Sequence, residues 1–125
     1  MSGSILLVDD DSLSRRNIAL FLRRAGYMVL EANSGEHGLD LIRTIDNFAL
    51  VISDLRMEGM ANGIDVLACQ AEVSPKAATI LITAFGSAEV KEEATALGAL
   101  YIEKPIHLED LLVKISHLLS TKRTM

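Results

Sequence analysis

At 125 residues the chain fits a single domain of ordinary size, long enough to bury a hydrophobic core without disulfides or structural metals. Half of its residues are hydrophobic and 23% are charged, a balance that excludes an intrinsically disordered chain. The formal net charge of −5 provides no basic face for direct nucleic-acid binding, and the single cysteine, Cys69, excludes an internal disulfide framework.

Short apolar runs of strand length alternate along the chain with segments of helical periodicity. In chain order, the strand-like runs are residues 5–8, 27–32, 50–52, 80–82 and 99–102, and the helical stripes are residues 18–25, 38–45, 64–71, 90–97 and 108–115. Glu31 interrupts the second run, so we expect that strand at an edge of the sheet. The alternation predicts an α/β domain: a doubly wound parallel sheet with right-handed crossovers and helices on both faces.

Residues that favour helix ends support these boundaries. Ser12, Ser34 and Ser87 stand where N-caps are expected, and Gly26 and Gly98 where helices should end. Residues 120–125 show no periodicity. We therefore predict one domain over residues 1–120 and a tail or the start of a linker at residues 121–125.

Targeting signals are absent from the sequence pattern. The N-terminus has no basic region ahead of its apolar run, and no apolar run approaches the roughly 18 residues needed to span a bilayer. The expectation is a cytoplasmic protein without a membrane partner.

Polar side chains with reactive chemistry follow the predicted strands. Asp9, Asp10 and Asp11 come after the first strand, Asp54 after the third, Thr83 ends the fourth and Lys104 ends the fifth. Ligands of open parallel sheets bind at the carboxyl ends of the strands, where the strand order reverses. For five strands in the order 2-1-3-4-5, that point lies between the first and third strands, so the acidic pair would lie beside Asp54.

Clustered carboxylates repel one another unless a cation or a shared proton offsets their charge. These carboxylates, with no thiol or imidazole among them, offer only oxygen ligands, and such ligands suit Mg²⁺. A carboxylate nucleophile, a divalent metal, the hydroxyl of Thr83 and the ammonium of Lys104 are the groups that stabilise a phosphoryl group in transfer. Asp54 is the candidate acceptor, because carboxylates can form acyl phosphates.

Four motifs in this order resemble the receiver domains of two-component response regulators, in particular those of enhancer-binding transcription activators. They are LLVDDD at residues 6–11, ISDLRM at 52–57, ITA at 82–84 and EKP at 103–105. The resemblance covers residues 4–119. It implies a flavodoxin-like fold, a five-stranded parallel sheet of order 2-1-3-4-5 with five helices on its two faces.

The resemblance also implies a metal-dependent phosphorylation site. Asp54 would be the phosphorylated residue, and Mg²⁺ would be bound by Asp9, Asp10, Asp54 and the backbone carbonyl of Arg56, with Asp10 the more direct ligand of the acidic pair. A sensor histidine kinase would supply the phosphoryl group. The domain would catalyse only its own phosphorylation and dephosphorylation and would not otherwise be an enzyme.

The same resemblance implies a conformational switch. Thr83 would hydrogen-bond the phosphoryl oxygen and Lys104 would form an ion pair with it, beside a cis peptide bond at Lys104–Pro105. Tyr101 would turn inward as Thr83 moves, changing the face formed by the fourth helix, the fifth strand and the fifth helix. That face would bind a partner or a second copy of the chain and control an output, with transcription the expected one.

One loop departs from the family pattern. Where family members commonly read Met-Pro-Gly-Met-Asp-Gly after the acceptor, residues 57–63 have Glu58 in place of proline and one extra residue, so we expect a longer, more mobile loop with Glu58 facing solvent. Arg56 and Phe85 occupy positions that tune the phosphoryl lifetime in the family.

Other functions fit the sequence less well. A haloacid-dehalogenase-like enzyme would carry a second aspartate where this chain has Arg56, and a flavin or nucleotide module would carry a phosphate loop where this chain has aspartates. A degenerate receiver would lack site residues that are present here. A stand-alone receiver that acts through a protein partner remains the alternative to a receiver followed by an effector domain; the resemblance favours the latter.

Overall fold

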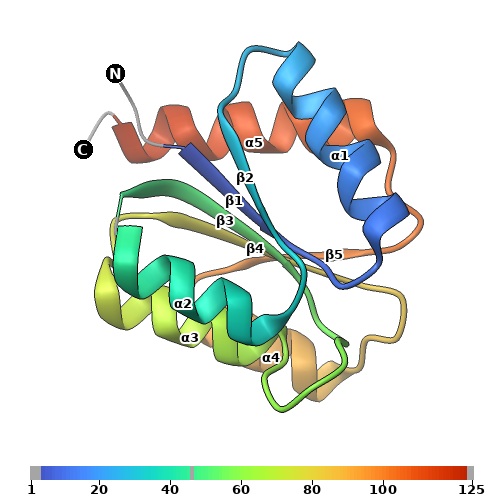
Figure 1. Ribbon diagram of the computed structural model, residues 1–125, viewed down its shortest axis with the longest axis vertical. Helices are drawn as coiled ribbons and strands as arrows, with labels where there is room; N and C mark the ends of the chain where they lie inside the picture. The colour runs from blue at the N-terminus through green and yellow to red at the C-terminus, as the bar shows by residue number, and fades with distance from the viewer. Residues whose placement is uncertain (1–3, 46, 124–125) are drawn as a thin grey trace.

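The computed structural model describes residues 4–45 and 47–123, which form five alternating strand and helix pairs (Figure 1). In chain order the elements are β1 (Ser4–Val8), α1 (Ser12–Arg24), β2 (Val29–Ala32), α2 (Gly35–Ile45), β3 (Phe48–Asp54), α3 (Gly63–Val73), β4 (Ala78–Thr83), α4 (Ala88–Ala96), β5 (Leu100–Glu103) and α5 (Leu108–Arg123).

All neighbouring strands pair in parallel, in the order β2-β1-β3-β4-β5. This confirms the predicted fold and places β2, with its Glu31, at an edge. The order reverses between β1 and β3, so the two chain segments that follow these strands leave the sheet side by side.

Helices cover both faces of the sheet: α1 and α5 lie on one side and α2, α3 and α4 on the other (Figure 1). Because successive strand residues point to opposite faces, alternate residues of one strand enter different cores. In β1, Ile5 and Leu7 pack toward α1 and α5, and Leu6 and Val8 pack toward α2 and α3.

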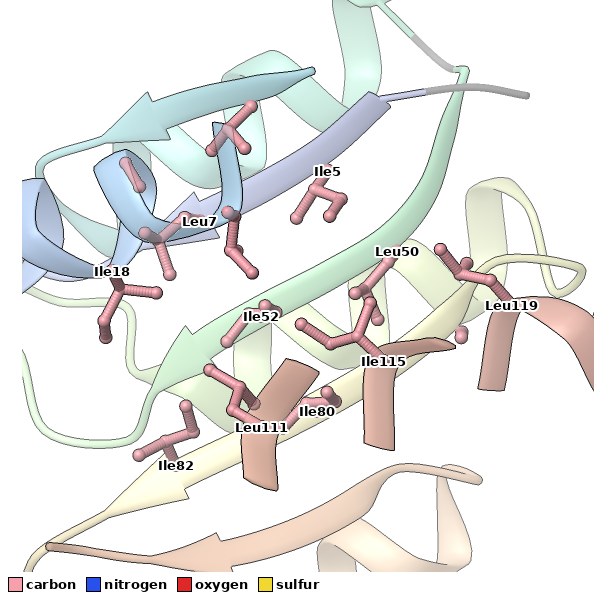
Figure 2. Packing of buried hydrophobic residues seen from close by; sticks show 14 residues of the cluster. Ile5, Leu7, Ile18, Leu50, Ile52, Ile80, Ile82, Leu111, Ile115 and Leu119 are labelled. Carbon is pink, nitrogen blue, oxygen red and sulfur yellow. The ribbon is translucent and has the colours of Figure 1, made fainter. Parts of the chain in front are cut away.

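The core under α5 joins the three central strands to that helix. Leu111, Ile115 and Leu119 extend from α5 over Leu50 and Ile52 of β3 and the isoleucines of β4 (Figure 2). Burying an aliphatic side chain of this size stabilises a fold by about 1.5–3 kcal/mol. The sheet is therefore a rigid platform for the loops at its carboxyl edge.

Local hydrogen bonds define most helix starts. The Ser34 hydroxyl accepts from the His37 N–H at 3.0 Å, and the Ser87 hydroxyl accepts from the Val90 N–H at 3.2 Å, as predicted. Ser12, in contrast, is the first helical residue of α1, and Asp11 is the N-cap. Helix α3 begins with a reciprocal cap in which Asn62 accepts from the Asp65 N–H and Asp65 accepts from the Asn62 N–H.

Two glycines end helices as predicted. Gly26, with φ of 100°, follows α1, and Gly98, with φ of 81°, follows α4. These positive φ values disfavour any residue with a Cβ.

The last helix is longer than predicted. Residues 120–123, which showed no periodicity, continue α5 to Arg123, because no glycine or proline interrupts the segment from Leu108 onward. Residues 124 and 125 lie outside the described residues. None of the helices described is long and apolar enough to cross a lipid bilayer.

An ion-pair network joins α1 to the edge strand. The Glu31 carboxylate pairs with Arg15 Nε at 3.0 Å and with Arg23 Nη1 at 3.1 Å. Each arginine also donates to a backbone carbonyl: Arg15 to that of Asp9 at 2.8 Å, and Arg23 to that of Val29 at 2.7 Å. The network binds both the first and the last turn of α1 to the edge strand.

Candidate functional site

The predicted site residues gather at the carboxyl edge of the sheet. Asp9 follows β1, Asp54 ends β3, Thr83 ends β4 and Lys104 follows β5. Three of these strands are consecutive neighbours, and β1 lies on the other side of β3. The fold thus unites residues separated by up to 95 positions in the sequence.

An ion pair lies at the centre of this edge. Lys104 Nζ donates to Asp54 Oδ2 at 2.8 Å, and the two side chains are only 28% and 13% exposed. Burial by itself would lower the pKa of Lys104, but the hydrogen bond and charge of Asp54, together with the charges of Asp9 and Asp11, outweigh burial and raise it. The lysine is therefore a positive charge held at the carboxylate of Asp54, the predicted acceptor.

The segment around Lys104 is hydrogen-bonded to the end of β4. Its backbone N–H donates to the carbonyl of Thr83 at 2.9 Å, and the Lys104–Pro105 peptide bond is cis, as the resemblance implied.

Asp9 is a buried carboxylate beside Asp54. Its side chain accepts from the Asp11 N–H at 3.0 Å, and the residue is only 3% exposed. Burial raises the pKa of Asp9, the hydrogen bond from Asp11 lowers it, and repulsion from the Asp54 carboxylate raises it further, leaving it above its ordinary value. Two neighbouring carboxylates, only one of which is paired with the ammonium of Lys104, favour an additional cation.

Asp10 is oriented differently. It is exposed, and its Oδ2 accepts from the backbone N–H of Glu58 at 2.8 Å. Within residues 4–45 and 47–123, no three His, Cys, Asp or Glu side chains converge closely enough to hold a metal ion by themselves. The all-oxygen pair of Asp9 and Asp54 nevertheless fits Mg²⁺, which proteins commonly hold through one or two carboxylates while water and phosphate complete its shell.

Thr83 at the end of β4 and Tyr101 on β5 lie next to each other at this edge of the sheet. The buried Thr83 hydroxyl accepts from the Phe85 N–H at 3.0 Å, and the half-buried Tyr101 places its hydroxyl 3.4 Å from Glu103 Oε2. The Tyr101 phenol lies against Gly86, where any Cβ would overlap it. The predicted switch residues thus lie on adjacent strands, separated by a loop that lacks a side chain at the point of contact.

The two positions associated with phosphoryl lifetime are in contact. The Arg56 guanidinium stacks over the Phe85 ring, 5.0 Å from its centroid, at the border of an open cleft of about 520 Å³ that also reaches Lys104 and Glu103. Glu58 is exposed, as predicted.

Two residues near the site had no role in the sequence analysis. Arg15 binds the carbonyl of Asp9, and Glu36 accepts hydrogen bonds from the backbone of the loop after Asp54. The partners are 6 and at least 24 residues apart in the chain, and no local sequence pattern reports such contacts.

Known proteins that are similar to the chain support one family. A cyclic di-GMP phosphodiesterase from Thermotoga maritima is 30% identical over 120 residues, 95% of this chain and 32% of that protein. The transcriptional regulatory protein ZraR of Escherichia coli is 38% identical over 108 residues, 86% of this chain and 24% of that protein. The crystal structure of a CheY-like receiver domain protein from Methanospirillum hungatei superimposes with a TM-score of 0.93 at 30% identity, covering 99% of this chain and 98% of that one.

The chain spans 24–32% of the length of the curated relatives it matches first. The family model of the response regulator receiver domain matches residues 5–116, nearly the whole chain. Receiver domains typically bind Mg²⁺ in an acidic pocket, take their phosphoryl group from a histidine kinase and are generally not enzymes for other substrates. With the matching fold and edge residues, this match shows that the chain belongs to the receiver domain family of two-component response regulators.

Proposed function

We propose that this receiver domain accepts a phosphoryl group on Asp54 from a sensor histidine kinase. The observation that carries the proposal is the 2.8 Å ion pair between Lys104 Nζ and Asp54 Oδ2, next to the buried Asp9. A carboxylate oxygen of Asp54 would attack phosphorus while the bond from phosphorus to the histidine nitrogen breaks. The electron pair of that bond would stay on the imidazole, and Asp54 would become an acyl phosphate.

Each neighbouring group would offset charge during this transfer. Lys104, already fixed at the acceptor, would pair with the phosphoryl oxygens, and the Thr83 hydroxyl would leave its contact with the Phe85 N–H and donate to one of them. Asp9, Asp10, Asp54 and the Arg56 carbonyl would hold Mg²⁺. When bound, the metal would neutralise charge on the phosphoryl oxygens.

The switch would use the contacts next to Thr83. Movement of that hydroxyl would free space for Tyr101 to turn inward, away from Glu103, and change the surface of α4, β5 and α5. This surface would then bind a protein partner or a second copy of the chain, as a shift between two packings. We place the domain, residues 1–120, in the cytoplasm, without direct contacts to nucleic acid or membrane.

The output we propose is transcriptional, through an effector domain beyond this chain, because ZraR is a transcriptional regulator in which the matching region is a minor part. A receiver that acts alone through a protein partner is the alternative.

Intact mass spectrometry tests phosphoryl acceptance. Incubation with acetyl phosphate and Mg²⁺ should add the mass of one phosphoryl group, and the gain should be lost with EDTA or in Asp54→Asn. Asp65→Asn, which alters a carboxylate used only in the cap of α3, should still gain it. Absence of the gain in folded wild-type protein, or its persistence in Asp54→Asn, would refute the proposal.

A further inference from the structure

The loop that follows Asp54 is anchored to α2 through one carboxylate. Glu36 Oε2 accepts from the Met60 N–H at 2.7 Å and from the Ala61 N–H at 2.9 Å. These bonds, with one to its own backbone N–H, lower the pKa of Glu36, so the side chain is ionised at neutral pH. The loop carries an extra residue relative to the family pattern and is bonded at the point where that residue must be accommodated.

Backbone packing brings the loop and the helix into direct contact. Gly59 has φ of 102°, and a Cβ there would lie 2.8 Å from Glu36 Oε1. A Cβ on Gly35 would overlap the carbonyl of Ala61. Helix α2 and the loop can approach this closely because both positions lack side chains.

The other side of the loop contacts the acidic pair. The Glu58 N–H donates to Asp10 Oδ2 at 2.8 Å, and the Gly63 N–H donates to the carbonyl of Leu55 at 2.9 Å, closing the loop at its base. Residues 58–61 are therefore bonded from two directions, by Asp10 after β1 and by Glu36 on α2. An ordered loop presents its carbonyls and orients Asp10 without the entropy cost that a free loop would incur on binding.

We infer that Glu36 is a positioning residue for the divalent cation. It touches none of the proposed metal ligands and acts through the loop, holding Glu58 against Asp10 and the Arg56 carbonyl in place. The inference rests on the proposed metal-dependent function and adds to it a residue from outside the carboxyl edge of the sheet.

Magnesium affinity of the full chain tests the inference, measured from amide chemical shifts during titration with MgCl₂. Glu36→Ala should raise Kd about tenfold or more, the usual effect of losing a group that orients metal ligands. The matched control is Asp40→Ala. Asp40 is an exposed acid one turn later on α2, so its substitution removes the same charge without affecting the hydrogen bonds to the loop. Its Kd should stay within about twofold of wild type.

Glu36→Gln separates hydrogen bonding from charge, because the amide oxygen can still accept from both N–H groups. It should keep Kd within about threefold of wild type. Without metal, amide exchange at Met60 and Ala61 should be slow in wild type and fast only in Glu36→Ala.

Unchanged Kd in Glu36→Ala would overturn the inference, as would equal losses in Glu36→Ala and Asp40→Ala or a loss in Glu36→Gln as large as in Glu36→Ala. Wild-type protein that binds no Mg²⁺ would instead refute the proposed metal site.

Discussion

Among single residues, Asp9 is kept in surroundings that disfavour its charge. Its pKa is raised, first by burial and further by repulsion from Asp54, relative to an ordinary value of 3.8. A raised carboxyl pKa means that the folded state holds this proton more tightly than the unfolded state. The resulting stability is present below the unfolded pKa and is lost as pH rises through the folded pKa, so at neutral pH the charge destabilises the metal-free fold.

We therefore expect Asp9→Asn to stabilise the metal-free domain at pH 7 by on the order of 1 kcal/mol. The amide oxygen can still accept from the Asp11 N–H, so only the charge is removed. Urea unfolding in EDTA measures the effect, and the advantage should vanish near pH 3, where Asp9 is protonated in both states. The control is Asp11→Asn, because Asp11 is an exposed neighbouring acid. A urea midpoint of Asp9→Asn at or below that of wild type would show that the charge of Asp9 does not destabilise the fold.

Between elements, Glu31 links α1 to the edge strand. Burial raises the pKa of Glu31, but hydrogen bonds from Arg15 and Arg23 and the charges of both arginines outweigh it and lower the pKa below its ordinary value of 4.5. The pKa of Glu31 is therefore shifted in the opposite direction to that of Asp9. The network stabilises the fold above about pH 4.5 and loses this contribution as pH falls through the folded pKa.

Glu31→Gln should therefore destabilise the domain at pH 7 by about 1–2 kcal/mol, because two arginines lose a charged acceptor. The difference from wild type should shrink toward pH 3, because protonation of Glu31 progressively removes its charge as pH falls through the folded pKa. Thermal unfolding at both pH values checks this against Glu109→Gln, an exposed acid at the start of α5, for which we expect little change. A difference that is equal at both pH values would mean that packing, not charge, explains the loss.

At the scale of the whole molecule, stability depends on two cores that share one sheet. Ile115 of α5 is fully buried against the central strands, whereas Val113, two residues earlier, is 68% exposed. Ile115→Ala should cost about 2–5 kcal/mol through lost burial and a residual cavity, and Val113→Ala should cost less than about 0.5 kcal/mol. Urea unfolding compares the two, and similar midpoints would show that α5 does not hold the sheet as described.

Most of the strands and helices can be predicted from the hydrophobic periodicity and from the residues that favour helix ends. Unbroken apolar runs identify strands covered on both faces. The order of reactive residues at strand ends predicts the carboxyl edge and, with the receiver resemblance, the candidate acceptor Asp54. The extent of α5 was underestimated, because its last turn lacks an apolar stripe, yet nothing there ends a helix. The reciprocal cap at Asn62 and Asp65 was missed although its spacing is visible in the sequence.

Contacts between distant segments explain the remaining differences. Arg15 is bonded to Glu31 and to the backbone of Asp9, and no local pattern in the sequence indicates either contact. The loop at residues 57–63 donates two hydrogen bonds to Glu36 of α2, which the sequence does not indicate either. Both outcomes depend on how helices lie across the sheet, and a single sequence does not encode that geometry in any local pattern.

The contact between Arg23 and Val29 also protects an open border of the sheet. Strand β2 has a neighbour on one side only. Because the Met28 carbonyl bonds to Ile5 of β1, the next carbonyl, that of Val29, faces away from the sheet, where Arg23 Nη2 occupies it. A strand from another molecule would have to displace this guanidinium before pairing with β2, so the domain can present a bare parallel sheet edge at high concentration while resisting edge-to-edge aggregation.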